Sequence, residues 1–255
     1  MSRPKAAKVG AKARAKSGAK SRTRRETPAT PRGKRLFTPA AIIERLDAEA
    51  PIPAWRAHGD PVAELVLTLL SQNTSDTNSG RAYQSLVARF SNWDAVVAAP
   101  VSAIEESIRV GGLARTKAPR LQALLVELRK RLGDDWDASR LQTLPLADAK
   151  VWLTSLPGVG PKTAACVLLF ALKRPALPVD THVHRVSQRL GLISEKTGAE
   201  VAHALLESQL TLGQVYPFHV ALIRHGRRVC KARRPLCEQC VLSDRCPSAR
   251  LGLAG

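Results

Sequence analysis

Four cysteines lie close together near the C-terminal end of the 255-residue chain, in the spacing C-x6-C-x2-C-x5-C. They are Cys230, Cys237, Cys240 and Cys246. Cysteine thiolates bind zinc and iron–sulfur clusters, and four of them this close can surround one inorganic centre. Zinc sites with four cysteines usually use two close pairs, whereas only Cys237 and Cys240 form a Cys-x2-Cys pair here. The spacing therefore indicates a metal centre and favours iron–sulfur over zinc.

A glycine-rich turn lies upstream, in the segment LTSLPGVGPKTAA at residues 153–165. Its form is that of two helices joined by a tight turn. Gly158 and Gly160 permit backbone dihedrals that other residues resist, and the turn with Val159 exposes N–H groups to an anion. Pro161 suits the first position of the next helix, whose positive N-terminal end then points at the same anion. We expect this turn to bind a phosphate.

Lys162 follows that turn and falls in the first turn of the second helix. The helix dipole and partial burial both disfavour an ammonium at this place, and a neutral amine is a nucleophile. The alternative is that Lys162 only contacts a phosphate. The local sequence leaves both interpretations open.

The segment PVDTHVHR at residues 178–185 adds an acid and two histidines. Asp180 before Thr181 is typical of a helix N-cap, which is the structural alternative to a catalytic acid. His182 and His184 form a His-x-His pair, but no third ligand at suitable spacing accompanies them. We therefore expect these histidines to make hydrogen bonds or packing contacts rather than bind a metal.

The chain is strongly basic, with a formal net charge of +19 and a pI of about 10.6. This balance favours a polyanionic partner such as nucleic acid. Residues 1–35 hold thirteen Lys or Arg against the single acid Glu26, and almost no large apolar side chain. They predict a disordered basic tail. Such a tail binds DNA phosphates or directs the chain to an organelle, unless it is a solvated tail with no specific role.

The sequence contains no apolar stretch of the roughly 18 residues that a membrane span needs. No apolar segment of a secretory signal follows the basic residues. The five cysteines are an odd number, which argues for a reducing compartment and for metal ligation over disulfides. We expect a soluble, non-secreted protein without a membrane partner, in which Cys166, outside the run, is a buried thiol.

The folded part of the chain is predicted to be helices separated by short turns. Thr38-Pro39 and Asp60-Pro61 each combine an N-cap residue with proline at the first helical position. Further helices are expected at about 75–90, 101–109, 116–132, 147–154, 161–173, 180–190, 197–209 and 214–228. No convincing strand pattern is present, and only 4% of the residues are aromatic. The fold class that follows is all-α.

Three segments together resemble the endonuclease III family of DNA glycosylases, within the helix–hairpin–helix superfamily. They are LPGVGPKTA, PVDTHVHRV and the cysteine run, and the resemblance extends from about residue 38 to residue 250. It implies that Lys162 is the catalytic lysine, that Asp180 is the catalytic aspartate, and that the four cysteines bind a [4Fe–4S] cluster. The implied partner is double-stranded DNA with a damaged base or an abasic site, bound by a monomer.

The resemblance also implies a reaction. A damaged base leaves the stack and enters a pocket, because the bond to be broken is out of reach inside the duplex. Lys162 attacks C1′ of the sugar, and β-elimination from the resulting Schiff base cuts the strand. Asp180 deprotonates Lys162 or stabilises positive charge on the sugar. We expect a bifunctional glycosylase and abasic-site lyase of base excision repair that removes oxidised pyrimidines. It would work in the bacterial cytoplasm, or in a eukaryotic nucleus or mitochondrion.

Further DNA-binding residues follow from the same resemblance. Gln72 and Asn73 belong to a helix-end loop that fills the gap left by the flipped base, with Asn73 where the family often has Gln. Leu113, after Gly111-Gly112, resembles an opposing wedge, its alternative being an ordinary core leucine. The remaining expected DNA contacts are His182 and the basic residues between the first two cysteines, which are Lys231, Arg233 and Arg234. The cluster would then be a structural clamp for that basic loop.

The architecture that the resemblance implies has two helical domains with DNA held between them. One is a six-helix domain at about 57–173, and the other joins residues 36–56 to 174–250 around the cluster. Asp180 would face Lys162 across the cleft.

Two departures from the family pattern, Thr154 and Ala114, affect lesion choice. The rival enzyme is a mismatch-adenine glycosylase, which lacks the lysine and carries a glutamate near Thr68. The rival of another class is a DNA-binding module without catalysis.

Overall fold

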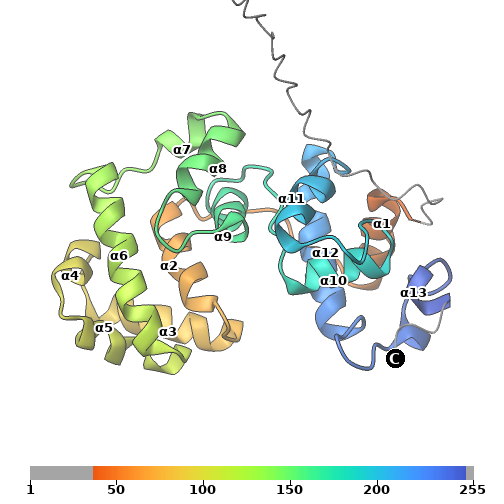
Figure 1. The fold of residues 1–255 in the computed structure, drawn as a ribbon, viewed down its shortest axis with the longest axis horizontal. Coiled ribbons are helices and arrows are strands. Elements are labelled where there is room, and N and C mark those ends of the chain that lie inside the picture. Colours follow the sequence, from red (N-terminus) through yellow and green to blue (C-terminus); the bar gives the residue numbers. More distant parts are fainter. Residues whose placement is uncertain (1–36, 251–255) are drawn as a thin grey trace, which may run out of the picture.

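The computed structural model describes residues 37–250, and every regular element in that range is a helix (Figure 1). The predicted all-α class is confirmed, and the expected basic tail at residues 1–35 lies outside the described residues. None of the helices within 37–250 has both the length and the apolar character needed to cross a membrane. Figure 1 shows two lobes side by side, α2 to α9 in one, and α1 with α10 to α13 in the other.

The first lobe contains eight α-helices: α2 (Pro61–Ser71), α3 (Asp76–Arg89), α4 (Trp93–Ala98), α5 (Val101–Ser107), α6 (Ala114–Leu132), α7 (Arg140–Thr143), α8 (Leu146–Thr154) and α9 (Pro161–Cys166). The second contains α1 (Pro39–Glu49), α10 (Thr181–Arg189), α11 (Ala199–Glu207), α12 (Val215–Arg228) and α13 (Pro247–Arg250). Short 3-10 turns are η1 (Arg109–Gly111), η3 (Leu212–Gln214) and η4 (Cys237–Gln239), and α9 continues as the π-helical turn η2 (Val167–Ala171).

The predicted helix starts are confirmed at the atomic level. The Thr38 hydroxyl accepts the N–H of Ala41 at 3.3 Å, and Asp60 accepts the N–H of Ala63 at 2.9 Å. Each cap satisfies one of the donors that a helix leaves unpaired at its N-terminus. The sequence reasoning missed α4 and α7, because six and four residues are too few to show a helical period.

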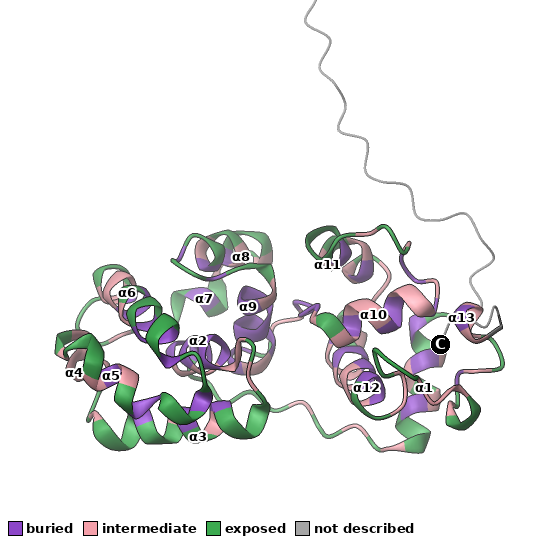
Figure 2. Cartoon of the chain, turned by 60° about the horizontal axis from the view of Figure 1, so that its bottom comes forward, coloured by how far each residue is buried: buried purple, intermediate pink, exposed green. Residues whose placement is uncertain are grey.

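Each lobe has its own hydrophobic core. In the first, α2 lies at the centre, with Leu65, Val66 and Leu70 almost fully buried (Figure 2). In the second, α12 supplies Phe218 and Leu222, and the N-terminal helix α1 packs beside it. Apolar burial of this kind is the main stabilising term in each lobe.

Two connections cross between the lobes. The first is the extended segment 50–60, and the second follows η2. The N–H groups of His58 and Gly59 donate to the carbonyls of Phe170 and Ala171, the last two residues of η2, at 3.2 and 3.1 Å. The first connection is therefore tied to the turn from which the second one starts.

Side chains reinforce the same junction. The indole N–H of Trp55 donates to the carbonyl of Leu169 at 2.8 Å, and its ring stacks on Tyr216 with centroids 5.4 Å apart. Lys150 of α8 pairs with Glu207 of α11 at 2.6 Å. The stacking thus fixes the first connection against the second lobe, and the Lys150–Glu207 ion pair joins the two lobes directly.

The second connection is held on both sides of Leu177. Its N–H donates to Glu207 Oε1 at 2.7 Å, and its carbonyl accepts from His203 Nδ1 at 2.9 Å. One residue later, His219 Nδ1 donates to the carbonyl of Pro178 at 2.9 Å. His219 is 3% exposed, and burial lowers its pKa to about 4. This imidazole is consequently neutral at physiological pH.

The buried imidazole predicts how stability depends on pH. Because the pKa of His219 falls from 6.5 to about 4 on folding, its contribution is present above pH 6.5 and is lost as the pH falls through about 4. The full effect is roughly 3 kcal/mol. In His219→Gln, which keeps a donor for Pro178, we expect the free energy of unfolding to fall less steeply over this range. Urea titrations at several pH values measure it, and equal slopes for both proteins would contradict the assignment.

Candidate functional site

A pocket of about 500 Å³ lies where the two lobes face each other. Its lining residues come from the end of α2 and the loop after it, from the first turns of α3, α9, α10 and α11, from the residues before α10, and from α12: Ser71, Gln72, Asn73, Thr74, Asp76, Lys162, Val179, Asp180, Thr181, His182, His184, Ala199 and Arg227. Five predicted site residues meet here, namely Gln72, Asn73, Lys162, Asp180 and His182. The cysteines and the basic loop lie elsewhere in the second lobe.

Lys162 enters the pocket from the start of α9. Pro161 is the first residue of that helix, as predicted, and Lys162 is the second. The residues that follow it, Thr163 and Ala164, are buried in the first lobe. The lysine is therefore fixed at its Cα by a packed helix while its side chain remains half-exposed.

The turn before Lys162 leaves N–H donors available. Gly158 has φ of +76°, a conformation that side chains resist, and the space around Gly158 and Gly160 is open. Neither glycine N–H has a partner among the described residues. Val159 differs from the prediction: its side chain is 6% exposed and its N–H donates to Leu156 at 3.2 Å. Val159 supports the turn from inside and offers no free donor to a ligand.

Asp180 is a helix cap and a pocket residue at once. Its Oδ1 accepts the N–H groups of His182 and Val183, at 2.9 and 2.7 Å, so the N-cap interpretation is correct. Its Oδ2 makes no hydrogen bond with any residue in 37–250. The carboxylate is thereby held rigidly with one oxygen left for chemistry.

The two histidines of the His-x-His pair make hydrogen bonds. His182 Nδ1 accepts from Arg185 at 3.1 Å, and His184 Nε2 donates to the carbonyl of Thr197 at 2.8 Å. Gly226 of α12 lies against His182, and a Cβ on that glycine would come within 2.9 Å of the His182 Cβ. Close approach of α10 and α12 at this point therefore depends on the glycine.

The sequence reasoning missed an ion pair at the pocket wall. Arg227 of α12 donates to both carboxylate oxygens of Asp76 at the start of α3, at 2.7 and 3.2 Å. The pair joins the lobes directly beside the pocket. Only its separation of 151 positions in the chain hid it.

A buried carboxylate near Lys162 was also missed. Glu64 is 8% exposed and bonds to His58 and to the Thr68 hydroxyl, each at 3.0 Å. Burial raises the pKa of Glu64, while these two bonds and the charge of Lys162 act the other way. Cys166 on α9 is buried as predicted, and burial raises its pKa to about 12. No sequence motif includes Glu64, because it is a single acidic residue on an otherwise apolar helix face.

The two predicted wedge residues stand on exposed loops. Asn73 and Leu113 both have positive φ, +53° and +54°, and Leu113 is 56% exposed. The alternative that Leu113 is a core leucine is wrong. The Thr74 hydroxyl donates to the Gly111 carbonyl at 2.5 Å, so a hydrogen bond ties the loops together.

The basic loop after Cys230 is exposed at Lys231, Arg233 and Arg234. Arg189 of α10 holds its base, donating to the carbonyls of Lys231 at 2.7 Å and of Ala232 at 3.1 Å. The three basic side chains therefore project from a fixed backbone but lie outside the pocket.

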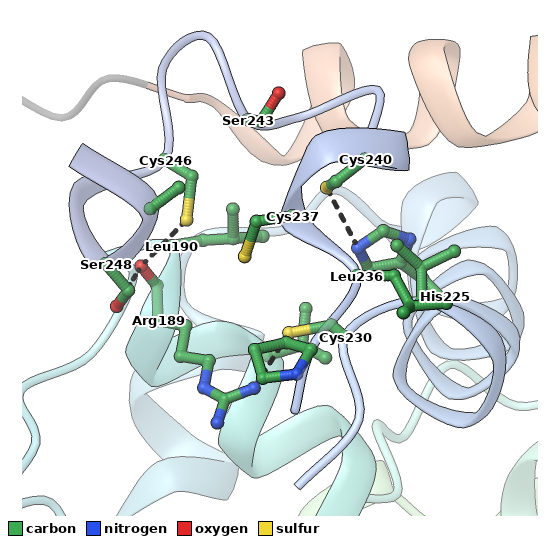
Figure 3. A pocket seen from close by; sticks show the side chains of 14 residues that line it. Arg189, Leu190, His225, Cys230, Leu236, Cys237, Cys240, Ser243, Cys246 and Ser248 are labelled. Carbon is green, nitrogen blue, oxygen red and sulfur yellow. Dashed lines mark hydrogen bonds between the residues drawn. The ribbon is translucent and has the colours of Figure 1, made fainter. Parts of the chain in front are cut away.

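Cys230, Cys237, Cys240 and Cys246 line one cavity in the second lobe (Figure 3). Val186 and Leu190 at the end of α10, and Val229 directly after α12, form its apolar wall. Within residues 37–250, no three His, Cys, Asp or Glu side chains converge on a point that suits a single metal ion. Thiols set around a cavity suit a cluster, in which each thiolate binds a different iron.

N–H donors reach the sulfur atoms of this cavity. The Arg189 guanidinium donates to Cys230 Sγ, and the N–H of Leu242 donates to Cys240 Sγ, both at 3.4 Å. Burial raises the pKa of the Cys240 thiol to about 11, so its thiolate needs a positive metal centre. Donors around metal-binding thiolates are the usual outer support of such a centre. The donor set and the cavity fit an iron–sulfur cluster.

Comparisons with known proteins agree with this arrangement. The family described as "HhH-GPD superfamily base excision DNA repair protein" matches residues 66–209, and the "iron-sulfur binding domain of endonuclease III" matches residues 230–246. The chain is 36% identical to endonuclease III of Thermotoga maritima over 80% of this chain and 92% of that protein.

Solved structures are similar over nearly the whole described chain. A non-covalent endonuclease III–DNA complex has a TM-score of 0.72 at 27% identity, covering 86% of this chain and 100% of that one. A trapped endonuclease III–DNA covalent intermediate has a TM-score of 0.73 at 28% identity, covering 85% and 99%.

The chain therefore belongs to the HhH-GPD superfamily of base excision DNA repair proteins, and within it to the endonuclease III family. It is a DNA-binding repair glycosylase with a [4Fe–4S] cofactor. The predicted family, enzyme class and cofactor are confirmed.

Removing one cysteine of the cavity tests the cluster. We expect Cys240→Ser to lower the iron content from about four atoms per chain and to lower the melting temperature, because the cluster cross-links this lobe. Cys166→Ala is the matched control, since that thiol is buried in the other core, and it should keep its iron. Iron and sulfide analysis with visible absorption measures both, and full iron content in Cys240→Ser would contradict the assignment.

Proposed function

We propose that this glycosylase is bifunctional: it removes oxidised pyrimidines and then cleaves the strand at the abasic site. The observation that carries the proposal is that Lys162 and Asp180, from the N-terminal ends of two helices in different lobes, line one pocket. A nucleophile and a fixed carboxylate beside the same cavity are the groups that covalent base removal needs.

The proposed chemistry begins with Lys162. Its neutral Nζ attacks C1′, the bond from C1′ to the base breaks, and the base leaves with the electron pair and takes up a proton. The nitrogen loses a proton, its lone pair forms the C1′=N bond of the protonated imine as the bond from C1′ to the ring oxygen O4′ breaks, and O4′ takes up a proton. Removal of a C2′ proton then expels the 3′ phosphate by β-elimination. Asp180 accepts the first proton from Lys162 or stabilises positive charge on the sugar.

DNA is held on both sides of this pocket. We assign a phosphate to the N–H groups of Gly158 and Gly160 and to the positive end of α9. Lys231, Arg233 and Arg234 are exposed and contact the backbone further along. His182 sits at the pocket and contacts the nucleotide.

The loops that carry Gln72, Asn73 and Leu113 occupy the space vacated by the flipped base. Leu113 supports this by its exposure, since an apolar side chain of that size is ordinarily buried.

The cluster has a structural task in this proposal. Cys230, Cys237, Cys240 and Cys246 are its ligands, and when bound it would cross-link four points within the segment 230–246, which contacts the end of α10 through Arg189. Arg189 then holds the basic loop from beneath. The chain's own contribution is to fix the position of three cations relative to the pocket.

The working unit we propose is a monomer of two domains. One covers about 57–173 and the other joins 36–56 to 174–250, and each contains one of the two hydrophobic cores. The monomer works where cellular DNA is kept. Thr154 and Ala114, which differ from the family pattern, bear on which oxidised base is preferred.

Lys162 and Asp180 can be tested separately. We expect Lys162→Ala to abolish the adduct that borohydride traps on abasic DNA, because no imine forms. Asp180→Asn should keep the helix cap, and with it the melting temperature, while slowing base release by on the order of 100-fold. Asp60→Asn makes the same change at the cap of α2 and should leave activity intact. A trapped adduct in Lys162→Ala would sink the assignment of the nucleophile.

A panel of duplexes tests the substrate class. We expect products from oxidised pyrimidines and abasic sites, with strand breaks before any alkali is added, because the lysine couples base removal to β-elimination. Release of mismatched adenine with breaks only after alkali would support the mismatch-adenine rival instead. DNA binding without any product would support a non-catalytic module.

A further inference from the structure

Lys117 is the buried cation of the first lobe. It lies in the first turn of α6 and is 4% exposed. Its ammonium donates to the Leu70 carbonyl at 2.7 Å, to the Thr74 hydroxyl at 2.7 Å and to the Gly111 carbonyl at 3.1 Å. All three of its N–H donors are used, and no carboxylate among the described residues pairs with it.

A lysine in this setting is unfavourable for stability unless its bonds are good. Burial lowers the pKa of Lys117, because the charged ammonium loses its hydration. The carbonyl of Leu70 lies in the last turn of α2, where the helix dipole presents its negative end. The ammonium is therefore held by oriented dipoles, a geometry that is lost if any acceptor moves.

The acceptors belong to two different loops. Leu70 and Thr74 flank the loop that carries Gln72 and Asn73, and Gly111 begins the loop that carries Leu113. The Lys117 ammonium thus donates hydrogen bonds to the residues at which both loops join their helices. The Thr74 hydroxyl closes the network through its own bond to the Gly111 carbonyl.

The far ends of these loops have a backbone that must be held in place. Asn73 and Leu113 adopt left-handed φ values of +53° and +54°, which non-glycine residues keep only when their surroundings enforce them. Gly111 is also wedged in position, because a Cβ there would meet the Ala82 Cβ at 2.9 Å. Each loop is therefore held by hydrogen bonds where it joins its helix, while Asn73 or Leu113 at the other end is exposed.

We propose that Lys117 is a positioning residue that couples the two loops, so that Asn73 and Leu113 enter the DNA duplex as one unit. The proposal rests on the duplex-entering role assigned to these loops in the proposed function. Lys117 itself does not touch the reacting atoms. It sets the separation of the two tips and prevents either loop from moving alone.

The variant Lys117→Met tests the coupling. Methionine fills a similar volume and removes the ammonium with its desolvation cost, which offsets part of the loss from leaving the Leu70 carbonyl without this donor. We expect the variant to fold and its release of an oxidised pyrimidine from duplex DNA to slow by about tenfold. Lys130→Met, an exposed lysine on the same helix, is the matched control and should behave as wild type.

A double-mutant cycle with Leu113→Ala distinguishes coupling through the loop from a general loss of stability, because only coupling makes the two losses in base-release rate non-additive. We expect Leu113→Ala alone to slow release by about tenfold as well, so two independent effects would multiply to about 100-fold. If Lys117 acts through this loop, Lys117→Met should instead cause little further loss in the Leu113→Ala background. Fluorescence of 2-aminopurine opposite an uncleavable abasic analogue reports loop entry without chemistry. Its rise on saturation with protein should shrink in each single variant, and no further in the double.

The outcomes separate the two proposals. Multiplying losses in the cycle, or an undiminished fluorescence rise in Lys117→Met, overturn the role of Lys117 alone. If Leu113→Ala releases the base and raises the fluorescence as the wild type does, the proposal that the loops enter DNA is overturned, and the coupling proposal with it. Should Lys117→Met fail to fold, Thr74→Val decides, because it removes the shared hydroxyl and should show the same non-additivity with Leu113→Ala.

Discussion

The pocket depends on how one stretch of backbone, residues 167–178, is tied down as it passes from the first lobe to the second. Lys162 stands before this stretch and Asp180 after it, so its path sets the distance between them. Trp55 and the neighbouring connection bind its first part, and Glu207, His203 and His219 bind its last part. The last three groups belong to the second lobe, while Arg174 within the stretch donates to the carbonyls of Leu141 and Leu144 in the first lobe, each at 2.6 Å. The proposed catalytic pair, Lys162 and Asp180, therefore behaves as one rigid unit, because hydrogen bonds leave the crossing little freedom.

Three buried ionisable groups lie around this arrangement. Glu64, Lys117 and His219 are each less than a tenth exposed. Burial raises the pKa of the acid and lowers the pKa of both bases, so burial of each group opposes stability. The polar atoms of Lys117 and His219 bind backbone or hydroxyl groups, and those of Glu64 bind the His58 imidazole and the Thr68 hydroxyl. The lobes thus give up part of their stability for a fixed geometry around the DNA.

In the second lobe, helix α10 makes contacts with functional residues at both of its ends. At its N-terminal end α10 is capped by Asp180, and at its C-terminal end Arg189 binds the carbonyls of the basic loop and the sulfur of Cys230. Arg185, between them, donates to the carbonyl of Cys230 at 3.1 Å and contacts His182. One short helix connects the pocket, the loop and the cluster. Its close packing on α12, which Gly226 allows, fixes the pocket, the basic loop and the cluster relative to one another.

The local features could be predicted from the amino-acid sequence alone: capped helix starts, the glycine turn before Lys162, the cysteine spacing and hence the family. These depend on residues near each other in the chain, where backbone preferences and ligand spacing act directly. The sequence did not determine that Val159 points inward or that Lys117 is buried, since a lone lysine at a helix start is ordinarily exposed. Nor did it show that Arg227 pairs with Asp76. Only the tertiary structure decided these, because burial and long-range pairing arise from how two separate cores are set against each other.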